Sequence, residues 1–145
     1  MRAALALLAL SLAIPATARA QTVEVPFHQY PNGLISIPCK TDIGNVLPCI
    51  LDTGSTMTIA DSKAVGDLPG PQVLTHTVAG SRYTRLVRTF VEVAGTKIPC
   101  TVGATDGLHK AGIDVLLGQD ILLQFSRVTF DYSRGVVIFE KRDRP

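Results

Sequence analysis

Short runs of β-branched and other apolar residues dominate this chain, and Gly, Asn and Asp residues separate the runs. Runs of this length bounded by turn residues are typical of β-strands, whereas helical periodicity is almost absent. The pattern therefore predicts an all-β domain. Its strands are expected at residues 22–27, 34–40, 46–51, 57–60, 73–78, 82–88, 89–93, 97–102, 113–117, 127–132 and 136–140.

Turn residues join neighbouring strands into hairpins. Ala79-Gly80-Ser81 connects two Thr- and Val-rich strands, Ala94-Gly95-Thr96 connects the next two, and Ser133-Arg134-Gly135 connects the last two. Glycine is favoured at such positions because it adopts the left-handed backbone conformation without a steric penalty. We therefore expect an antiparallel arrangement over much of the chain.

Helical structure is expected in two short segments. Asp61 is a favourable N-cap residue for one helical turn that extends to Val65. The segment 119–125 is the better helix candidate, because Ile121, Leu122 and Phe125 can face one side at helical spacing.

The first twenty residues have the pattern of an export signal. Arg2 precedes the apolar stretch 3–14, and Ala18 and Ala20 supply the small residues of a cleavage site. That stretch is shorter than the ~20 apolar residues a transmembrane helix needs, and no later segment approaches this length. Gln21, rather than a cysteine, follows the cleavage site, so no lipoprotein anchor is indicated. We expect a signal peptide at residues 1–20 and a periplasmic or secreted protein without a membrane anchor.

Residues 21–145 are long enough for one domain with a single modest core, but not for a second lobe. Because Arg2 and Arg19 lie in the leader, its removal lowers the formal net charge from +2 to zero. A nucleic-acid-binding surface needs an excess of basic residues concentrated in one place. We therefore expect no nucleic-acid partner.

One acidic motif follows an apolar strand. Asp52-Thr53-Gly54 comes directly after Cys49-Ile50-Leu51. A carboxylate in this position leaves the end of the sheet in a tight turn, and the following glycine allows the backbone to approach it closely. The tripeptide alone indicates no more than a polar turn. A second motif, Leu116-Leu117-Gly118, changes this interpretation, because there an apolar strand also runs into Gly and then into a short helix.

Together the two motifs resemble those of the aspartic-peptidase superfamily, and within it the single-domain retroviral-type peptidases (retropepsins), over roughly residues 34–140. The resemblance implies a retropepsin-type acid-protease β-barrel with one short C-terminal helix. It also implies a flap hairpin that closes over substrate through Ala79, Gly80 and Ser81. Because the chain offers one Asp-Thr-Gly only, a homodimer would be needed, and in this family the terminal strands interleave to hold it.

The resemblance assigns a role to each residue of the first motif. Peptide hydrolysis by carboxylates needs one ionised group to activate water and one protonated group to bind the scissile carbonyl. Two aspartates about 3 Å apart share one proton and supply both roles. Asp52 from each subunit would form this pair, and Thr53 would bond across the dimer axis. The Gly54 amide would approach the carboxylate, and the Ser55 hydroxyl would donate to its outer oxygen.

We therefore expect an exported aspartic endopeptidase that hydrolyses a peptide or protein substrate and requires no metal or cofactor. Two departures from the family are visible. The flap tip has Ala79-Gly80 in place of consecutive glycines, and Gln119 and Thr56 stand where many members have an Arg–carboxylate pair. The alternative is a non-catalytic β-barrel of the same fold that binds peptides or dimerises, since an intact Asp52 permits catalysis without proving it.

Other chemistries have weaker support. Ser55 lacks the Gly-x-Ser-x-Gly context of a serine nucleophile. His28, His76 and His109 have no paired spacing typical of a zinc site. The motif also resembles the phosphate-binding hairpins of sugar-kinase-like ATPases, but those proteins need two α/β domains and a much longer chain.

The cysteines allow two interpretations. In a hairpin centred near residues 43–44, Cys39 and Cys49 fall opposite each other, at a Cα separation compatible with a disulfide. Export would permit oxidation. Both a bridge and two reduced, buried thiols remain open, while Cys100 is expected as a small buried apolar residue rather than a nucleophile.

Overall fold

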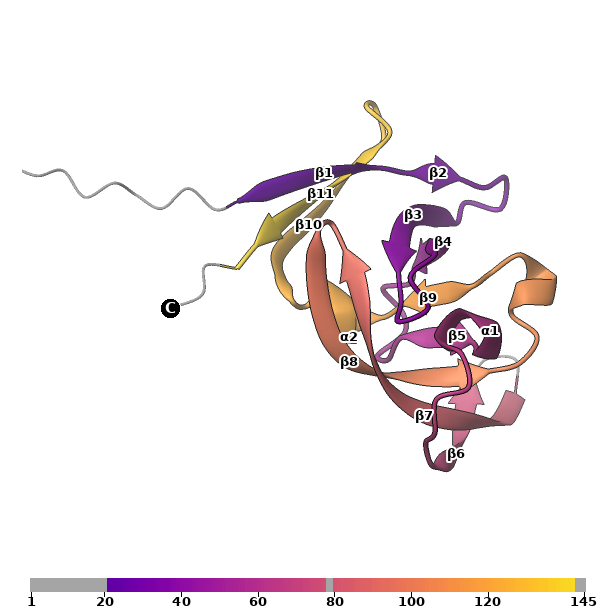
Figure 1. Cartoon of the computed structure of the whole chain (residues 1–145). Helices are drawn as coiled ribbons and strands as arrows, with labels where there is room; N and C mark the ends of the chain where they lie inside the picture. The colour runs from indigo at the N-terminus through magenta and orange to yellow at the C-terminus, as the bar shows by residue number, and fades with distance from the viewer. Residues whose placement is uncertain (1–20, 78–79, 143–145) are drawn as a thin grey trace, which may run out of the picture.

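The computed structural model describes residues 21–77 and 80–142 (Figure 1). Strands dominate it, as the sequence pattern predicts. In chain order the elements are β1 (Thr22–Pro26), β2 (His28–Gln29), β3 (Ile35–Lys40), β4 (Val46–Leu51), β5 (Ile59–Asp61), α1 (Ser62–Val65), β6 (Gln72–Thr77), β7 (Gly80–Val93), β8 (Thr96–Thr105), the 3-10 turn η1 (His109–Ala111), β9 (Val115–Leu117), α2 (Gln119–Leu122), β10 (Phe125–Asp131) and β11 (Val136–Lys141).

Eight strands form one curved sheet in the order β2-β3-β4-β9-β5-β8-β7-β6. A further pairing of β3 with β7, at Lys40 and Glu92, joins two strands that stand apart in this order and closes the sheet into a barrel. The core is built mainly from Val, Ile and Leu side chains inside this barrel, among them Ile37, Val91 and Leu117, which are almost inaccessible to water. The prediction of an all-β barrel is confirmed.

The remaining three strands form a separate sheet in the order β1-β11-β10 (Figure 1). β1 pairs antiparallel with β11 of the same chain, so Thr22 lies opposite Glu140. Arg134, in the turn between β10 and β11, contacts Asp131 at 2.7 Å and Glu24 of β1 at 3.0 Å. This pairing within one chain differs from the interleaving of terminal strands between subunits that the resemblance implied.

The predicted boundaries of two strands are wrong. Residues 82–93 belong to one 14-residue strand, β7, rather than to two strands. β8 continues through Gly103 to Thr105 instead of ending there. A Cβ atom at Gly103 would lie 2.7 Å from Thr84 and 2.9 Å from Ile59. Glycine therefore does not break this strand, because it allows β8 to pass closely between its neighbours.

The predicted helical segments are present but short. Asp61 accepts a hydrogen bond from the Lys63 amide and begins α1, which ends at Val65 as expected. α2 ends at Leu122, because Phe125 is buried and already belongs to β10. In the described residues, no helix has the length and apolar character needed to cross a membrane.

Candidate active site

Parallel pairing of β4 with β9 brings the ends of the two motif strands together. Ile50 lies beside Leu116, and Leu51 lies beside Leu117. The Asp52 amide then donates to the Leu117 carbonyl at 3.0 Å, which continues the pairing by one bond. The chain thus places the start of the Asp-Thr-Gly loop directly beside the Gly of the second motif.

Close backbone contact explains why Gly118 occupies this position. A Cβ atom there would lie 2.6 Å from the Met57 carbonyl carbon and 2.7 Å from its oxygen. Real Cβ atoms do not approach backbone so closely, and backbone cannot rotate out of the way as a flexible side chain does. The loop that carries Asp52 therefore crosses over Gly118 at a distance that only glycine allows.

Within the loop, the Asp52 carboxylate is half-buried and its Oδ1 accepts a hydrogen bond from the Gly54 amide at 3.0 Å. This is the contact that the resemblance implies for Gly54. The Ser55 hydroxyl instead donates to the Met57 carbonyl at 2.6 Å. Because a hydroxyl has one proton to donate, the expected bond from Ser55 to the carboxylate does not form in this structure.

Gln119, which follows the second motif, binds the loop through both its side chain and its backbone. The Gln119 amide nitrogen Nε2 donates to the Thr53 carbonyl at 2.8 Å, and its backbone amide donates to the Ser55 carbonyl at 2.8 Å. Gln119 therefore still connects α2 to the loop, although it cannot form the ion pair seen in many family members. Its partner is the loop backbone rather than Thr56.

The sequence analysis did not find the contact between Thr58, which is buried, and Asp120, which is half-buried. Thr58 has no exposed surface; its Oγ1 accepts from the Gly118 amide at 3.0 Å and donates to Asp120 Oδ1 at 2.7 Å. Asp120 also accepts from the Ile121 amide at 3.0 Å. Two signals point to this pair in retrospect: a polar residue within the apolar run 57–60, and an acidic residue in the first turn of a helix.

The flap hairpin consists of β6 and the first half of β7. Ala79, one of the three predicted flap residues, lies outside the described residues. Gly80 lies opposite Thr77, and Ser81 lies opposite His76, with 2.7 Å between Ser81 Oγ and His76 Nδ1. The hairpin exposes two large side chains, Leu74 and Tyr83, that lie opposite each other on the two strands.

The base of the hairpin reaches the segment that follows Asp52. Thr84 of β7 is buried, and its Oγ1 lies 2.7 Å from Thr75 Oγ1. A Cβ atom added to Gly103 would lie 2.7 Å from Thr84 and 3.1 Å from Met57. The flap strands are therefore packed onto the barrel beside the candidate site.

A disulfide joins Cys39 to Cys49, with 5.8 Å between the Cα atoms. The prediction that the two residues lie directly opposite each other is wrong. They are diagonal, because Cys39 pairs with Leu47 and Cys49 pairs with Ile37. The hairpin turn is centred one residue earlier than the sequence indicated, which shifts the pairing by two residues. The bridge ties β3 to β4 three residues before Asp52.

The third cysteine has a different environment. Cys100 is half-buried on β8, and burial, with the nearby charge of Asp120, raises the pKa of its thiol to about 11. A thiol with such a pKa is protonated near neutral pH and is a poor nucleophile. In residues 21–77 and 80–142, no group of three or more His, Cys, Asp and Glu side chains is placed to bind a metal ion.

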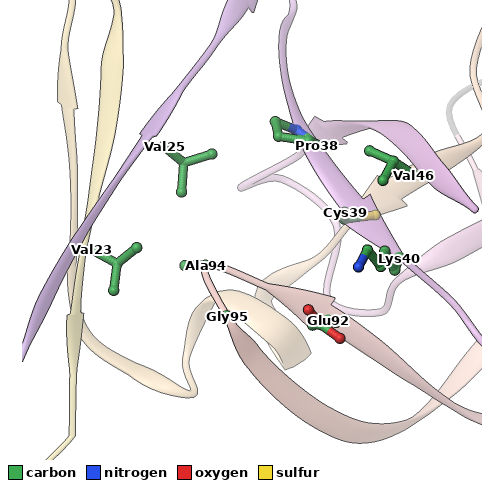
Figure 2. A pocket seen from close by; sticks show the side chains of 9 residues that line it. All are labelled: Val23, Val25, Pro38, Cys39, Lys40, Val46, Glu92, Ala94 and Gly95. Atoms are coloured by element: carbon green, nitrogen blue, oxygen red, sulfur yellow. The ribbon is translucent and has the colours of Figure 1, made fainter. Parts of the chain in front are cut away.

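A shallow pocket of about 240 Å³ opens elsewhere, between β1, the β3–β4 hairpin and the β7–β8 turn. Figure 2 shows Val23 and Val25 extending from β1 toward it, with Ala94 at the opposite turn. None of its lining residues belongs to the Asp52 loop or to the second motif. They are Val23, Val25, Pro38, Cys39, Lys40, Val46, Glu92, Ala94 and Gly95.

Comparison with known proteins identifies the fold. No family model matches the chain, and no curated protein matches it in sequence. Among solved structures, it is similar to a retropepsin-like aspartic protease from Rickettsia conorii, with a TM-score of 0.58 and 18% identity. The match covers 85% of this chain and 94% of that one. The chain has a retropepsin-like fold.

The Asp52 carboxylate lies on a turn that follows the end of β4. The loop geometry holds one oxygen, Oδ1, on the Gly54 amide. Leu117 of β9 and Gln119 of α2 hydrogen-bond the loop, and the Gly118 amide between them donates to the Thr58 hydroxyl at the end of the loop. The arrangement thus presents one carboxylate on a well-supported turn, with a hairpin packed beside it.

Proposed function

We propose that this chain is an exported aspartic endopeptidase that acts as a homodimer. The Asp52 carboxylates of two subunits would share one proton and activate a water molecule for attack on a peptide bond. The observation that carries the proposal is the Asp52 loop itself: an Asp-Thr-Gly turn in a retropepsin-like barrel, with Oδ1 bonded to the Gly54 amide.

The chemistry follows from the protonation states of the pair. Two carboxylates about 3 Å apart cannot both ionise, so they titrate as a unit with one apparent pKa lowered and one raised. The ionised group draws a proton from water, and the protonated group hydrogen-bonds the scissile carbonyl. The proton then passes to the leaving nitrogen. Water is the nucleophile, so no covalent intermediate forms.

Binding of an extended substrate is assigned to the flap hairpin and the space beside the two loops. Gly80 and Ser81 lie at the described end of this hairpin, and Ala79 belongs to the same turn in the sequence. By resemblance, the site would favour apolar side chains on both sides of the cut. Export to the periplasm or the cell exterior is supported by the leader pattern and by the disulfide between Cys39 and Cys49.

The test compares residues 21–145 with the Asp52→Asn variant on a peptide library between about pH 3 and 7, a range that includes the upper pKa of a typical aspartate pair. Asp67→Asn is the matched control, because this side chain is fully exposed. We expect the wild type and the control to cleave peptides, and Asp52→Asn to cleave none at equal dimer content. Cleavage that survives in Asp52→Asn would contradict the mechanism.

A verified dimer that cleaves nothing and binds no statine-type inhibitor would favour the alternative, a non-catalytic barrel that binds peptides. The two functions differ in one further measurement. If the protein is a peptidase, a statine-type inhibitor should raise the unfolding temperature of the wild type but not of Asp52→Asn. If it is a peptide-binding module, peptides should raise the unfolding temperature of both proteins.

A further inference from the structure

One pocket lies apart from the Asp52 loop, between β1, the β3–β4 hairpin and the β7–β8 turn. Its volume is about 240 Å³. An apolar cavity of about 150 Å³ holds one benzene molecule, so this pocket suits a ligand of roughly ten non-hydrogen atoms. The pocket belongs to a single chain, and a ligand there therefore depends neither on a dimer nor on peptide cleavage.

One side of this pocket is apolar. Val23 and Val25 of β1 line it, and Figure 2 shows Lys40 and Glu92 on the other side. Val25 is buried and Val23 is half-buried. The methyl group of Ala94 adds to the apolar surface at the β7–β8 turn. Such a surface binds a hydrocarbon group because the contact removes apolar area from water.

Ala94 has a backbone conformation that favours glycine. Its φ angle is 50°, and among the non-glycine residues that the structure describes it alone has a positive φ. A residue with a side chain is strained in this conformation, and such residues are frequent at ligand-binding sites. Ala94 is only 8% exposed, so its methyl group is covered where it lines the pocket. The turn therefore keeps a methyl group in the pocket at a cost in backbone strain.

The other side of the pocket has two opposite charges without partners. Lys40 of β3 lies directly opposite Glu92 of β7, so their side chains are on the same face of the sheet. Glu92 also lies opposite Lys97 of β8, but the Lys97 ammonium lies over the Phe90 ring, 3.5 Å from its centroid. In the described part of the chain, neither Lys40 nor Glu92 forms a salt bridge. An ammonium and a carboxylate are thus available to a ligand.

We propose that this pocket binds a free α-amino acid with a branched apolar side chain. Lys40 pairs with the carboxylate of the ligand, and Glu92 pairs with its ammonium group. The side chain of the ligand lies against Val23, Val25 and Ala94. Directly opposing residues of antiparallel strands have Cα atoms ~4.5–5.5 Å apart, so one small ligand can contact both charged groups. An apolar surface with a few polar groups that fix orientation is the usual composition of a small-ligand site.

NMR titration of the mature protein, residues 21–145, with L-leucine tests the site. Amide signals of residues 23–25, 39–40 and 92–95 should shift, whereas those of residues 52–58 should not. Because exposed charge pairs are weak, we expect a dissociation constant on the order of 1 mM. N-acetyl-L-leucine lacks the ammonium group, L-leucinamide lacks the carboxylate and glycine lacks the side chain. Each of them should bind about fivefold more weakly than leucine, or weaker still.

Lys40→Gln and Glu92→Gln test the two charges, with Lys97→Gln as the matched control. Lys97 is exposed and lies opposite the same Glu92, but it does not line the pocket. Each pocket variant should raise the dissociation constant for leucine about fivefold or more. Lys97→Gln should leave it unchanged.

Ala94→Gly separates binding from folding. Glycine adopts the left-handed conformation without strain, so the unfolding temperature of this variant should not fall. Loss of the methyl group from the pocket should nevertheless weaken leucine binding about threefold.

Three results would overturn the proposal. They are equal binding of leucine and N-acetyl-L-leucine, undiminished leucine binding by Lys40→Gln and Glu92→Gln, and amide shifts that leucine causes only in residues 52–58 or not at all. The proposed peptidase is tested separately, because Asp52 does not line this pocket. Leucine binding here by a protein that cleaves no peptide would support the site and refute the peptidase.

Discussion

The Asp52 loop and the flap hairpin are held in opposite ways. In the loop, the Asp52 amide donates to the Leu117 carbonyl and the Ser55 carbonyl accepts from the Gln119 amide. The buried Thr58 hydroxyl accepts from the Gly118 amide. The hairpin is a two-stranded extension whose Leu74 and Tyr83 side chains are 51% and 71% exposed. A reacting group needs a fixed position, whereas a segment that admits and releases substrate needs low local stability. The comparison indicates that different segments meet these two demands: the Asp52 loop provides the fixed position, and the flap hairpin provides the low local stability.

The largest effect is expected where the loop meets glycine. Gly118→Ala would place a methyl group 2.6 Å from the Met57 carbonyl carbon. Neither backbone can move away without breaking the β4–β9 pairing, so we expect a loss of about 3 kcal/mol or more, the upper range for overpacking. Chemical denaturation measures it. Gly112→Ala, at a left-handed turn with open space around it, should cost less than half as much.

Removing the disulfide should have the next largest effect. The Cys39→Ala, Cys49→Ala double variant opens a loop with a sequence separation of 10 residues, and we expect about 2–3 kcal/mol less stability in the chain-entropy picture. Comparing oxidised and reduced wild type provides the control, since reduction should reproduce most of the loss. An equally stable reduced protein would contradict the role of the bridge in holding β4.

Thr58→Val tests the buried support directly. The substitution keeps the shape of the side chain but leaves the Gly118 amide without its acceptor and removes one of the two hydrogen bonds to Asp120 Oδ1. We expect a loss of about 1–3 kcal/mol, the cost of unsatisfied buried groups. If the protein is a peptidase, kcat should fall more than KM rises. Thr101→Val, on an exposed site, should change neither quantity.

Asp61 gives a smaller effect that depends on pH. Burial disfavours the charged carboxylate of Asp61, but hydrogen bonds from the backbone amides of His109 and Lys63 outweigh this effect and hold its pKa below the ordinary 3.8. The lowered pKa contributes stability above pH 3.8, and this contribution is lost as pH falls through the folded-state pKa. Asp61→Asn should therefore cost about 1 kcal/mol at neutral pH. Denaturation at acidic pH should show a smaller difference between the two proteins.

The smallest effect on global stability is expected in the flap. Tyr83→Ser removes an exposed side chain whose cross-strand partner is Leu74, so global stability should change by less than about 0.5 kcal/mol. Hydrogen exchange of the amides in residues 72–85 should nevertheless become faster, while exchange in residues 52–58 stays the same. Equal acceleration in both segments would remove the proposed difference between loop and flap.

Local sequence patterns predicted the features that depend on residues close together in the sequence. The strand that ends at Asp52, the Gly54 contact and the Asp61 cap each involve residues within a few positions of one another. Thr58 and Asp120, by contrast, are 62 residues apart, and no local pattern relates them. Their contact follows from the antiparallel pairing of β5 with β9, which places Ile59 opposite Leu116 and is a long-range feature of the fold.

Two other predictions were wrong for different reasons. Glycine favours a strand end, but Gly103 lies within β8 because the neighbours Thr84 and Ile59 leave no room for a side chain there. This error comes from packing between distant segments. The Ser55 hydroxyl was assigned to Asp52 from the resemblance, but the local conformation of the loop brings the Met57 carbonyl to it instead.

The pairing of β1 with β11 also affects the order of folding. Thr22 and Glu140 meet across most of the chain, and Cys49 meets Val115 across nearly half of it. Contacts between such distant residues require large loops to close first, which slows folding. The β3–β4 hairpin can form early, but the strand beside Asp52 arrives only after most of the chain has been synthesised. A nascent chain therefore carries its acidic motif long before it has the scaffold that gives the motif a fixed shape.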